Sequence, residues 1–268
     1  MPDRQFHTGD VSLRYRDEGA GPAIVFIHGW TLDLDLWEMQ AGRLSKSMRV
    51  VRFDRRGFGL STGAPDPGAD AGDLVALLDQ LQIDRAVVVG MSQGARAALA
   101  VAWRFPERVT ALVLDGPPDF MGAADSEPDA DLSLAAYRAL VRESGLDAFR
   151  RVWRDHALMR LRTDDLAARA LLDRMLARYP GADLATEPAS AAAEDRKALE
   201  SLTLPVLILN GSADTPARVA AGNRLVQVLP RAVRGWVPGA GHLANLDNPV
   251  VYDEVLRTFL RRQSRAAA

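Results

Sequence analysis

Residues 86–96 read AVVVGMSQGAR, and this stretch decides the fold of the chain. A short β-branched run is followed by a tight turn and then by small residues suited to a helix. The turn has the pattern Gly-x-Ser-x-Gly, from Gly90 to Gly94. At such a strand-to-helix turn the central residue, Ser92, is held in a strained backbone conformation that exposes its hydroxyl. The stretch therefore predicts a nucleophilic serine. The alternative is an ordinary glycine-bracketed turn whose serine caps a helix.

Composition limits the classes of protein that the chain can belong to. Its 268 residues allow one large domain or a domain with an insertion. The net charge of −2 gives no indication of a nucleic-acid partner or an anionic membrane surface. With no cysteine, disulfides, thiolate catalysis and cysteine-based metal sites are excluded. No apolar run approaches the roughly 20 residues that span a bilayer, and the polar N-terminus lacks a signal-peptide core. We therefore expect a soluble, cytoplasmic protein.

Apolar strand-like runs alternate with amphipathic helical stretches along most of the chain. Besides the run before Ser92, strands are expected at Val11–Arg16, Ala23–Ile27, Arg49–Phe53, Ala111–Asp115, Leu204–Leu209 and Val233–Val237. Helices are expected at Trp37–Leu44, Asp73–Leu81, directly after Ser92, and at about Pro249–Arg262. This alternation predicts the α/β class, with a mostly parallel, doubly wound sheet.

The alternation stops after residue 118. Residues 119–202 show helical patterning without a convincing strand, so we expect a helical cap inserted into a core formed by residues 1–118 and 203–268. Within the insertion, Phe149, Val152, Trp153 and His156 follow the i, i+3, i+4, i+7 spacing. That spacing predicts one apolar helix face.

A serine nucleophile needs a base within hydrogen-bond reach, and the base needs an acid that orients it. Among the four histidines, His242 lies in a glycine-rich loop after a predicted strand. Asp214 also follows a strand, at the carboxyl edge where open α/β sheets place their sites. The order Ser92, Asp214, His242 is the order of a Ser–acid–His triad on this architecture. Asp115 also ends a strand and is the alternative acid.

Acyl chemistry further requires hydrogen-bond donors for the developing oxyanion. The backbone N–H of Gln93, directly after the nucleophile, is one candidate. The second is the N–H of Trp30, in the loop that follows the strand Ala23–Ile27. His28 is interpreted as an organiser of that loop rather than a base, and Arg56 as a member of a buried ion pair rather than an anion hook.

The two remaining histidines have weaker claims on function. His7 is expected to be solvated because its segment is polar. His156 is expected to line the core or the pocket of the helical insertion, since a lone histidine on an apolar face is a weak signal.

Over almost its whole length the chain resembles the α/β-hydrolase superfamily. The motifs that carry the resemblance are His28-Gly29-Trp30, Asp54-x-Arg56-Gly57-x-Gly59-x-Ser61, Gly90-x-Ser92-x-Gly94, Asp214, and Gly241-His242-x-x-Asn245-Leu246 before Pro249. Within the superfamily the chain looks most like the 3-oxoadipate enol-lactonases and related carboxylesterases. The resemblance implies Ser92 as nucleophile, His242 as base, Asp214 as acid, the N–H groups of Trp30 and Gln93 as oxyanion hole, and a helical cap over the pocket. At position 93 this chain has glutamine, whereas methionine or leucine is common in these relatives. The resemblance therefore does not define the side chain at the pocket floor.

The expected function is hydrolysis of a small carboxylic ester or lactone through an acyl-enzyme intermediate, without a metal or organic cofactor. Two other possibilities are kept. The same triad could cleave a carbon–carbon bond or carry out a lyase or perhydrolase reaction, and the fold could serve as a small-molecule receptor. The expected partner is a small-molecule substrate, and the chain is expected to be a monomer or a homodimer.

Overall fold

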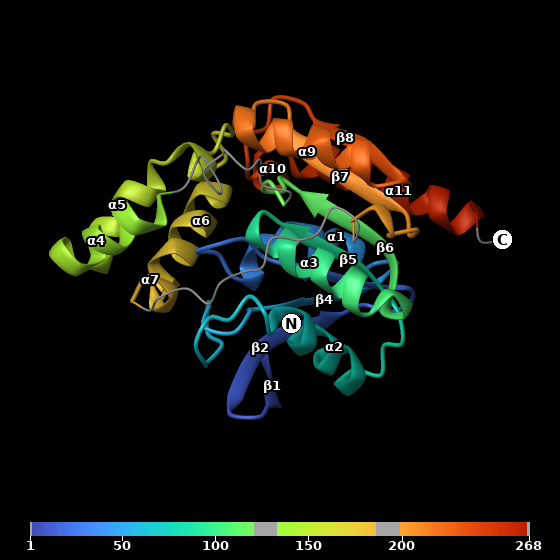
Figure 1. Ribbon diagram of the computed structural model, residues 1–268, viewed down its shortest axis with the longest axis horizontal. Coiled ribbons are helices and arrows are strands. Elements are labelled where there is room, and N and C mark those ends of the chain that lie inside the picture. Colours follow the sequence, from blue (N-terminus) through green and yellow to red (C-terminus); the bar gives the residue numbers. More distant parts are fainter. Residues whose placement is uncertain (1, 121–132, 186–198, 267–268) are drawn as a thin grey trace.

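The computed structural model describes residues 2–120, 133–185 and 199–266, and its centre is one sheet of eight strands (Figure 1). The strands are β1 (Arg4–Thr8), β2 (Val11–Glu18), β3 (Ala23–Ile27), β4 (Arg49–Phe53), β5 (Ala86–Met91), β6 (Val109–Asp115), β7 (Val206–Gly211) and β8 (Ala232–Val237). Their order in the sheet is β1-β2-β4-β3-β5-β6-β7-β8. Only β2 runs antiparallel to its neighbours, β1 and β4. The α/β class and the mostly parallel sheet expected from the sequence are confirmed.

Two apolar layers cover the two faces of the sheet. One contains α2 (Asp70–Gln80), α3 (Gln93–Arg104) and α9 (Pro216–Val228), whose buried leucines, valines and alanines pack on Val25 and Val88. The other contains α1 (Glu38–Leu44) and α11 (Pro249–Ala266). The central strands read as continuous apolar runs because both of their faces are covered. No helix in the described ranges is long and apolar enough to cross a membrane.

A helical insertion lies between β6 and β7, drawn in yellow and gold in Figure 1. It contains α4 (Leu134–Ser144), α5 (Leu146–Arg154), the 3-10 turn η3 (Ala157–Met159), α6 (Leu166–Arg178) and α7 (Ala182–Ala185). Its described residues contain no strand, as the sequence predicts. Residues 121–132 and 186–198 of the expected cap lie outside the described residues. The apolar residues of the insertion continue the layer of α1 and α11.

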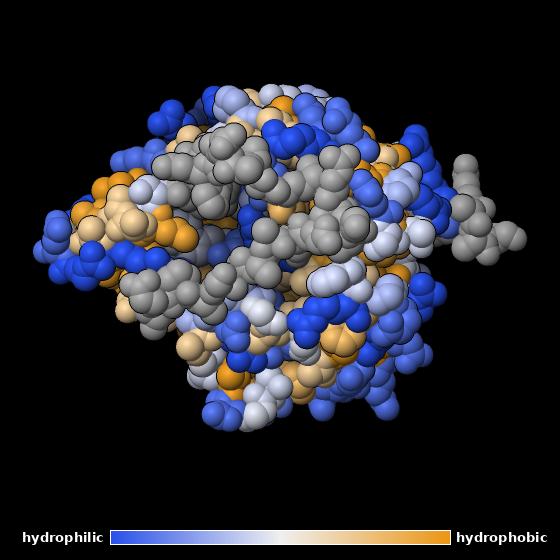
Figure 2. Space-filling view, in the orientation of Figure 1, coloured by the Kyte–Doolittle hydropathy of each residue, from blue (hydrophilic) through white to orange (hydrophobic). Residues whose placement is uncertain are grey.

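The apolar face predicted for α5 is only partly formed. Phe149 and Trp153 are fully buried, but Val152 is 50% exposed. The i, i+3 spacing places Val152 on the edge of the helix face, beyond the elements that cover its neighbours. Figure 2 accordingly shows apolar, orange surface on the insertion among charged, blue surface.

An arginine joins the insertion to the core. Arg178, at the end of α6, donates to Asp33 (2.7 Å) and to Asp35 (2.6 Å) in the segment after β3. Both acids are buried. A buried carboxylate is costly unless a partner compensates its charge, so this contact ties the position of α6 to the core.

The first strand of the N-terminal hairpin, β1, is not among the predicted strands, whereas β2 contains the predicted strand Val11–Arg16. β1 pairs with β2 at the edge of the sheet. There the Asp3 carboxylate accepts hydrogen bonds from the Nε atoms of Arg14 at 2.7 Å and Arg16 at 2.5 Å. Its side chains are mostly exposed, so RQFHT lacks the apolar pattern that identifies an interior strand. His7 is exposed on this strand, as expected.

Two helical glycines offer a matched test of the close packing of α3 on the sheet. A Cβ on Gly94 would lie 2.5 Å from the carbonyl oxygen of His28, whereas a Cβ on Gly72 in α2 meets nothing within 4 Å. We expect Gly94→Ala to lower the free energy of unfolding by about 1–3 kcal/mol, as overpacking does. Gly72→Ala is expected to raise it by up to about 1 kcal/mol, because alanine favours the helix.

Urea unfolding of both variants measures the difference. Equal stabilisation by the two substitutions would contradict the close contact between α3 and the segment after β3.

Candidate active site

Ser92 occupies a sharp turn between β5 and α3. Its backbone has φ 52° and ψ −118°, which is uncommon for a residue other than glycine. A Cβ on Gly90 would collide with the carbonyl group of Gly94, so β5 and α3 can approach this closely only because position 90 is glycine, and a Cβ on Gly94 would collide with the carbonyl of His28 after β3. The N–H of Ser92 donates to the carbonyl of Asp115 in β6 at 2.8 Å. The strained conformation predicted from the sequence is therefore present and is held by the neighbouring strand.

The loop after β3 passes beside the serine. A Cβ added to Gly29 would lie 3.3 Å from the Cβ of Ser92, so only glycine permits this approach without displacing a neighbour. Trp30 follows directly, and Gln93 begins α3. Within the described residues, neither backbone N–H donates a hydrogen bond. The two predicted oxyanion donors are thus brought to the serine with their N–H groups available.

His242 and Asp214 meet at the same edge of the sheet. The imidazole Nδ1 lies 3.0 Å from Oδ1 and 3.2 Å from Oδ2 of Asp214, with both side chains buried. The two loops that carry them are joined by backbone bonds, including Ala213 N–H to the Ala240 carbonyl at 2.8 Å. Residues from the loops after β7 and β8 therefore form one rigid pair.

Several donors keep the carboxylate of Asp214 charged. Burial alone would raise its pKa, but the His242 imidazole, the Asn210 amide and the Thr215 N–H more than offset burial and lower the pKa below its usual value. Asn210 Nδ2 donates to Oδ2 of Asp214 at 2.8 Å, and Arg234 donates to Asn210 Oδ1 at 2.7 Å. Sequence analysis missed the role of Asn210. The signal was a single amide at the end of an otherwise apolar strand.

Asp115 lies nearby without contacting the imidazole. Its carboxyl oxygens are buried, and no hydrogen bond joins them to His242. Burial raises its pKa well above the usual value and the charge of Asp214 raises it further, while the Tyr252 hydroxyl opposes this only in part. Of the two candidate acids, the structure thus places Asp214 and not Asp115 on His242.

Ser92 and His242 line one small cavity between the core and the helical insertion. Its apolar walls are Trp30, Leu32, Met91, Trp153, Leu158 and Met159. The volume is about 10 Å³, about the space that one water needs. His242 Nε2 is buried without a hydrogen-bond partner among the described residues, so its bond to the serine is not made in this conformation. Catalytic hydrogen bonds are often open until substrate is bound.

The insertion touches the loop after β3 through polar bonds within an aromatic cluster. Trp30 Nε1 donates to Asp183 at 2.5 Å, and Asp183 also accepts from Tyr179. Trp153 Nε1 donates to Thr31 Oγ1 at 2.7 Å. Thr31 has φ 64°, a conformation that β-branched residues rarely adopt. The strained loop beside Ser92 is therefore held in part by the insertion.

The other polar residues singled out in the sequence have structural partners. His28 Nε2 accepts the N–H of Arg55 at 3.0 Å, and burial, reinforced by the Arg55 charge, lowers the His28 pKa well below its usual value. It is thus a neutral organiser of its loop, as interpreted. Arg56 pairs with Asp73 at 2.6 Å, which confirms the expected ion pair.

The sequence left the effect of Gln93 on the pocket floor open and predicted that His156 lines the core or the pocket. His156 is half-buried and is not one of the residues that line the cavity. The Gln93 side chain accepts from Arg55 at 2.6 Å, which ties it to the arginine instead of leaving it loose at the pocket floor. His156 stacks on Trp153 with ring centroids 4.6 Å apart, and its Nδ1 accepts the N–H of Leu158. His156 therefore supports two cavity walls.

Comparisons with known proteins agree with this architecture. The family model described as alpha/beta hydrolase fold matches residues 22–249. A 2-(acetamidomethylene)succinate hydrolase of Mesorhizobium japonicum is 29% identical, over 96% of this chain and 94% of its own. A 3-oxoadipate enol-lactonase of Acinetobacter baylyi is 26% identical, over 94% of each chain.

A solved structure shows the same fold over the whole chain. The thermophilic esterase from Thermogutta terrifontis superposes with a TM-score of 0.83 at 24% identity, covering 98% of this chain and 99% of its own. Together with the match over residues 22–249, this establishes that the chain belongs to the α/β-hydrolase family and is an enzyme of that family.

Proposed function

We propose that this enzyme is a serine hydrolase that cleaves a small carboxylic ester or lactone through an acyl-enzyme intermediate. The observation that carries the proposal is the shared cavity of Ser92 and His242, in which the serine is strained and the imidazole is held by Asp214. Nucleophile, base and orienting acid are the three groups that such chemistry requires.

In the first half-reaction Ser92 Oγ attacks the substrate carbonyl carbon while its proton passes to His242 Nε2. The carbonyl oxygen becomes an oxyanion and accepts hydrogen bonds from the N–H groups of Trp30 and Gln93. The tetrahedral intermediate then collapses, the bond to the leaving oxygen breaks, and the imidazolium returns its proton to that oxygen. In a lactone the leaving alcohol stays tethered to the acyl group.

In the second half-reaction water replaces the alcohol. His242 Nε2 takes a proton from the water as it attacks the acyl-enzyme carbonyl, and collapse of the second intermediate returns that proton to Ser92 Oγ. The carboxylic acid is released and the serine is regenerated.

Asp214 keeps the imidazole in the tautomer that this cycle needs. Its lowered pKa leaves a carboxylate that accepts the Nδ1–H of His242, so that Nε2 carries the lone pair facing the cavity. Asn210 fixes the carboxylate from the other side. The charge on Asp214 also stabilises the imidazolium that forms during attack.

The apolar lining of the cavity supports a substrate with an apolar acyl group. Leu158, Met159 and Trp153 of the insertion line this cavity together with Ser92. This supports the division into a cap of residues 119–202 and a core of residues 1–118 and 203–268, although residues 121–132 and 186–198 lie outside the described residues. The Acinetobacter baylyi relative is by its name an enol-lactonase, which supports esters and lactones as the substrate class.

Removal of the nucleophile tests the mechanism directly. Ser92→Ala is expected to lower kcat on p-nitrophenyl acetate by about 10⁴-fold or more, since the triad acts as a unit. A fluorophosphonate probe should label wild-type protein and not this variant. Ser47→Ala, an exposed serine at the opposite edge of the sheet, is the matched control and should be labelled normally. Retention of most activity in a folded Ser92→Ala would refute the proposal.

Paired substitutions of the two candidate acids test which one orients the base. Asp214→Asn is expected to lower kcat by about 10⁴-fold, because the amide favours the wrong imidazole tautomer. Asp115→Asn is expected to leave kcat near that of wild type, because the imidazole of His242 is hydrogen-bonded by Asp214 and not by Asp115. Measurement of kcat for both variants at pH 7 shows which of the two acids orients the base. The reverse order of effects would move the acid to Asp115.

The residues on the insertion side of the cavity should determine which acyl chain length the enzyme prefers. Leu158→Ala is expected to raise the ratio of kcat/KM for p-nitrophenyl hexanoate over acetate by about tenfold or more, since each methylene accommodated in an apolar site is worth at least that much. Val152→Ala, exposed on the same insertion, is the control and should leave the ratio unchanged. An unchanged ratio in folded Leu158→Ala would show that the cavity does not bind the acyl group.

A further inference from the structure

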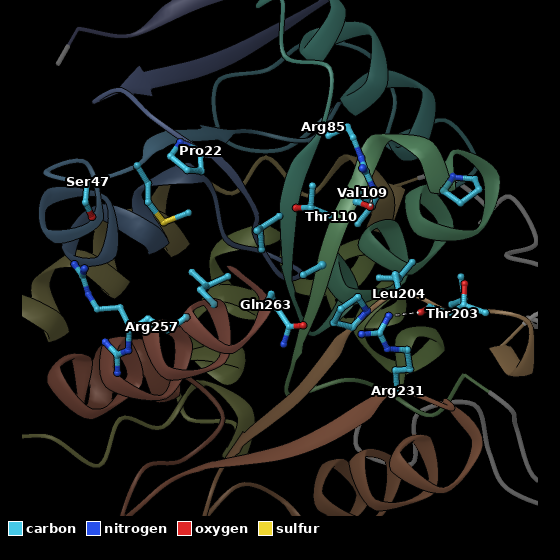
Figure 3. Close-up of a pocket in the computed structure, with 18 of the residues that line it drawn as sticks. Pro22, Ser47, Arg85, Val109, Thr110, Thr203, Leu204, Arg231, Arg257 and Gln263 are labelled. Carbon is cyan, nitrogen blue, oxygen red and sulfur yellow. Dashed lines mark hydrogen bonds between the residues drawn. The ribbon is translucent and has the colours of Figure 1, made fainter. Parts of the chain in front are cut away.

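A second, larger hollow lies at the opposite edge of the sheet from Ser92. Figure 3 shows this hollow, whose volume is about 930 Å³. Its walls come from the segments where strands begin, including Pro22 before β3, Arg85 before β5, Leu204 before β7 and Arg231 before β8, and from the end of α11. Small-molecule sites have volumes of roughly 300–1,000 Å³, so the hollow has room for a ligand.

The charged residues that line the hollow are all arginines. Arg85, Arg231, Arg257 and Arg261 line it, and no aspartate or glutamate among the described residues does, although acids and bases are nearly balanced in the chain as a whole. Figure 3 shows Arg85, Arg231 and Arg257 on different sides of the hollow, with Gln263 between them.

The arginines of the hollow bond to neutral oxygens. The acceptors are the carbonyl of Val109 for Arg85 (3.3 Å), of Thr203 for Arg231 (3.0 Å), of Arg43 for Arg257 (2.9 Å), and the hydroxyl of Thr258 for Arg261 (3.0 Å). In the described part of the chain none of the four forms an ion pair with a carboxylate. Elsewhere Arg55, Arg56 and Arg178 each have a carboxylate partner. Among the described residues, the positive charge around the hollow is thus not paired with a carboxylate at ion-pair distance, although Arg257 and Asp253 attract each other over a longer distance.

The floor of the hollow is apolar. Val87, Val109, Ala111 and Leu202 are buried beneath it, and the exposed lining is mostly carbon. Apolar surface favours a ligand that brings a hydrocarbon body, while a cationic rim favours a negatively charged head. Strand starts and one helix end surround the hollow and make it concave, a shape that suits a small molecule rather than a flat bilayer surface.

We propose that this hollow is a binding site for an amphipathic carboxylate, separate from the catalytic site. The carboxylate lies on the arginines of the rim and the hydrocarbon body lies on the floor formed by Val87, Ala111 and Leu202. Guanidinium groups bind carboxylates through paired hydrogen bonds. The site requires no movement of the insertion, because every residue that lines it lies outside residues 133–185.

The experiment measures decanoate binding to the intact protein by isothermal titration calorimetry. Arg261→Glu is compared with Arg262→Glu, which changes the net charge equally at an exposed neighbour that does not line the hollow. We expect about five- to tenfold weaker binding for Arg261→Glu, since charge reversal removes an attraction and adds a repulsion, and no change for Arg262→Glu. Thr110→Trp, on the exposed rim, should block binding by filling the space. Ester hydrolysis should be unchanged in all three variants.

Competing compounds separate the possible sources of binding. Decyl phosphate should displace decanoate, whereas inorganic phosphate, decanol and decyltrimethylammonium should not. Equal binding by Arg261→Glu and Arg262→Glu would overturn the proposal, and Arg231→Glu repeats the comparison if Arg261→Glu does not fold. Displacement by inorganic phosphate alone would reduce the site to a simple anion site and also overturns it. A third outcome is that the wild-type protein sediments with acidic lipid vesicles, Arg261→Glu does not, and neither protein binds decanoate. That result would overturn the proposal and show a membrane-facing surface instead.

Discussion

The contact of α3 with the end of β5 is the constraint on which the site depends. Side chains larger than hydrogen at Gly90 or Gly94 would collide with backbone, so the chain reverses direction in the least possible space. This forces Ser92 to a positive φ, and the strain persists because the carbonyl of Asp115 holds the Ser92 N–H. Packing of the core, rather than any bond of the hydroxyl, thus determines where the serine is placed.

Around that turn the candidate site is formed by two parts of the chain, the core loops and the insertion, which are held in place by different kinds of bond. Asp214 and His242 lie on loops joined to each other by backbone bonds, and Arg234 and Asn210 support the carboxylate from within the sheet. The opposite wall belongs to the insertion, which is joined to the core by side chains such as Arg178. In the proposed mechanism, proton transfer therefore uses residues of the core alone, whereas the insertion forms part of the wall of the substrate cavity.

Motifs at strand ends could be placed from the sequence because parallel strands bring their carboxyl ends to one edge. That rule predicted the neighbourhood of Ser92, Asp214 and His242, but it could not choose between Asp214 and Asp115, which both follow strands. The choice depends on how the loops after β7 and β8 bond to each other. Some residues have roles that depend on contacts between distant parts of the chain, and no periodic sequence pattern predicts them. Examples are Asn210, the exposed Val152 and the arginines of the second hollow.

The hydrogen bond from Trp153 to Thr31 has a consequence for how substrate binding and catalysis are linked. Thr31 adopts an unfavourable backbone angle one residue after Trp30, and the indole that steadies it belongs to α5. If α5 moves away to admit a molecule, this bond has to break, and the backbone of Thr31 loses its support from Trp153. A movement of the insertion that admits substrate would therefore also act on the backbone beside Trp30, because the Trp153–Thr31 bond and the Trp30–Asp183 bond both join the insertion to this loop.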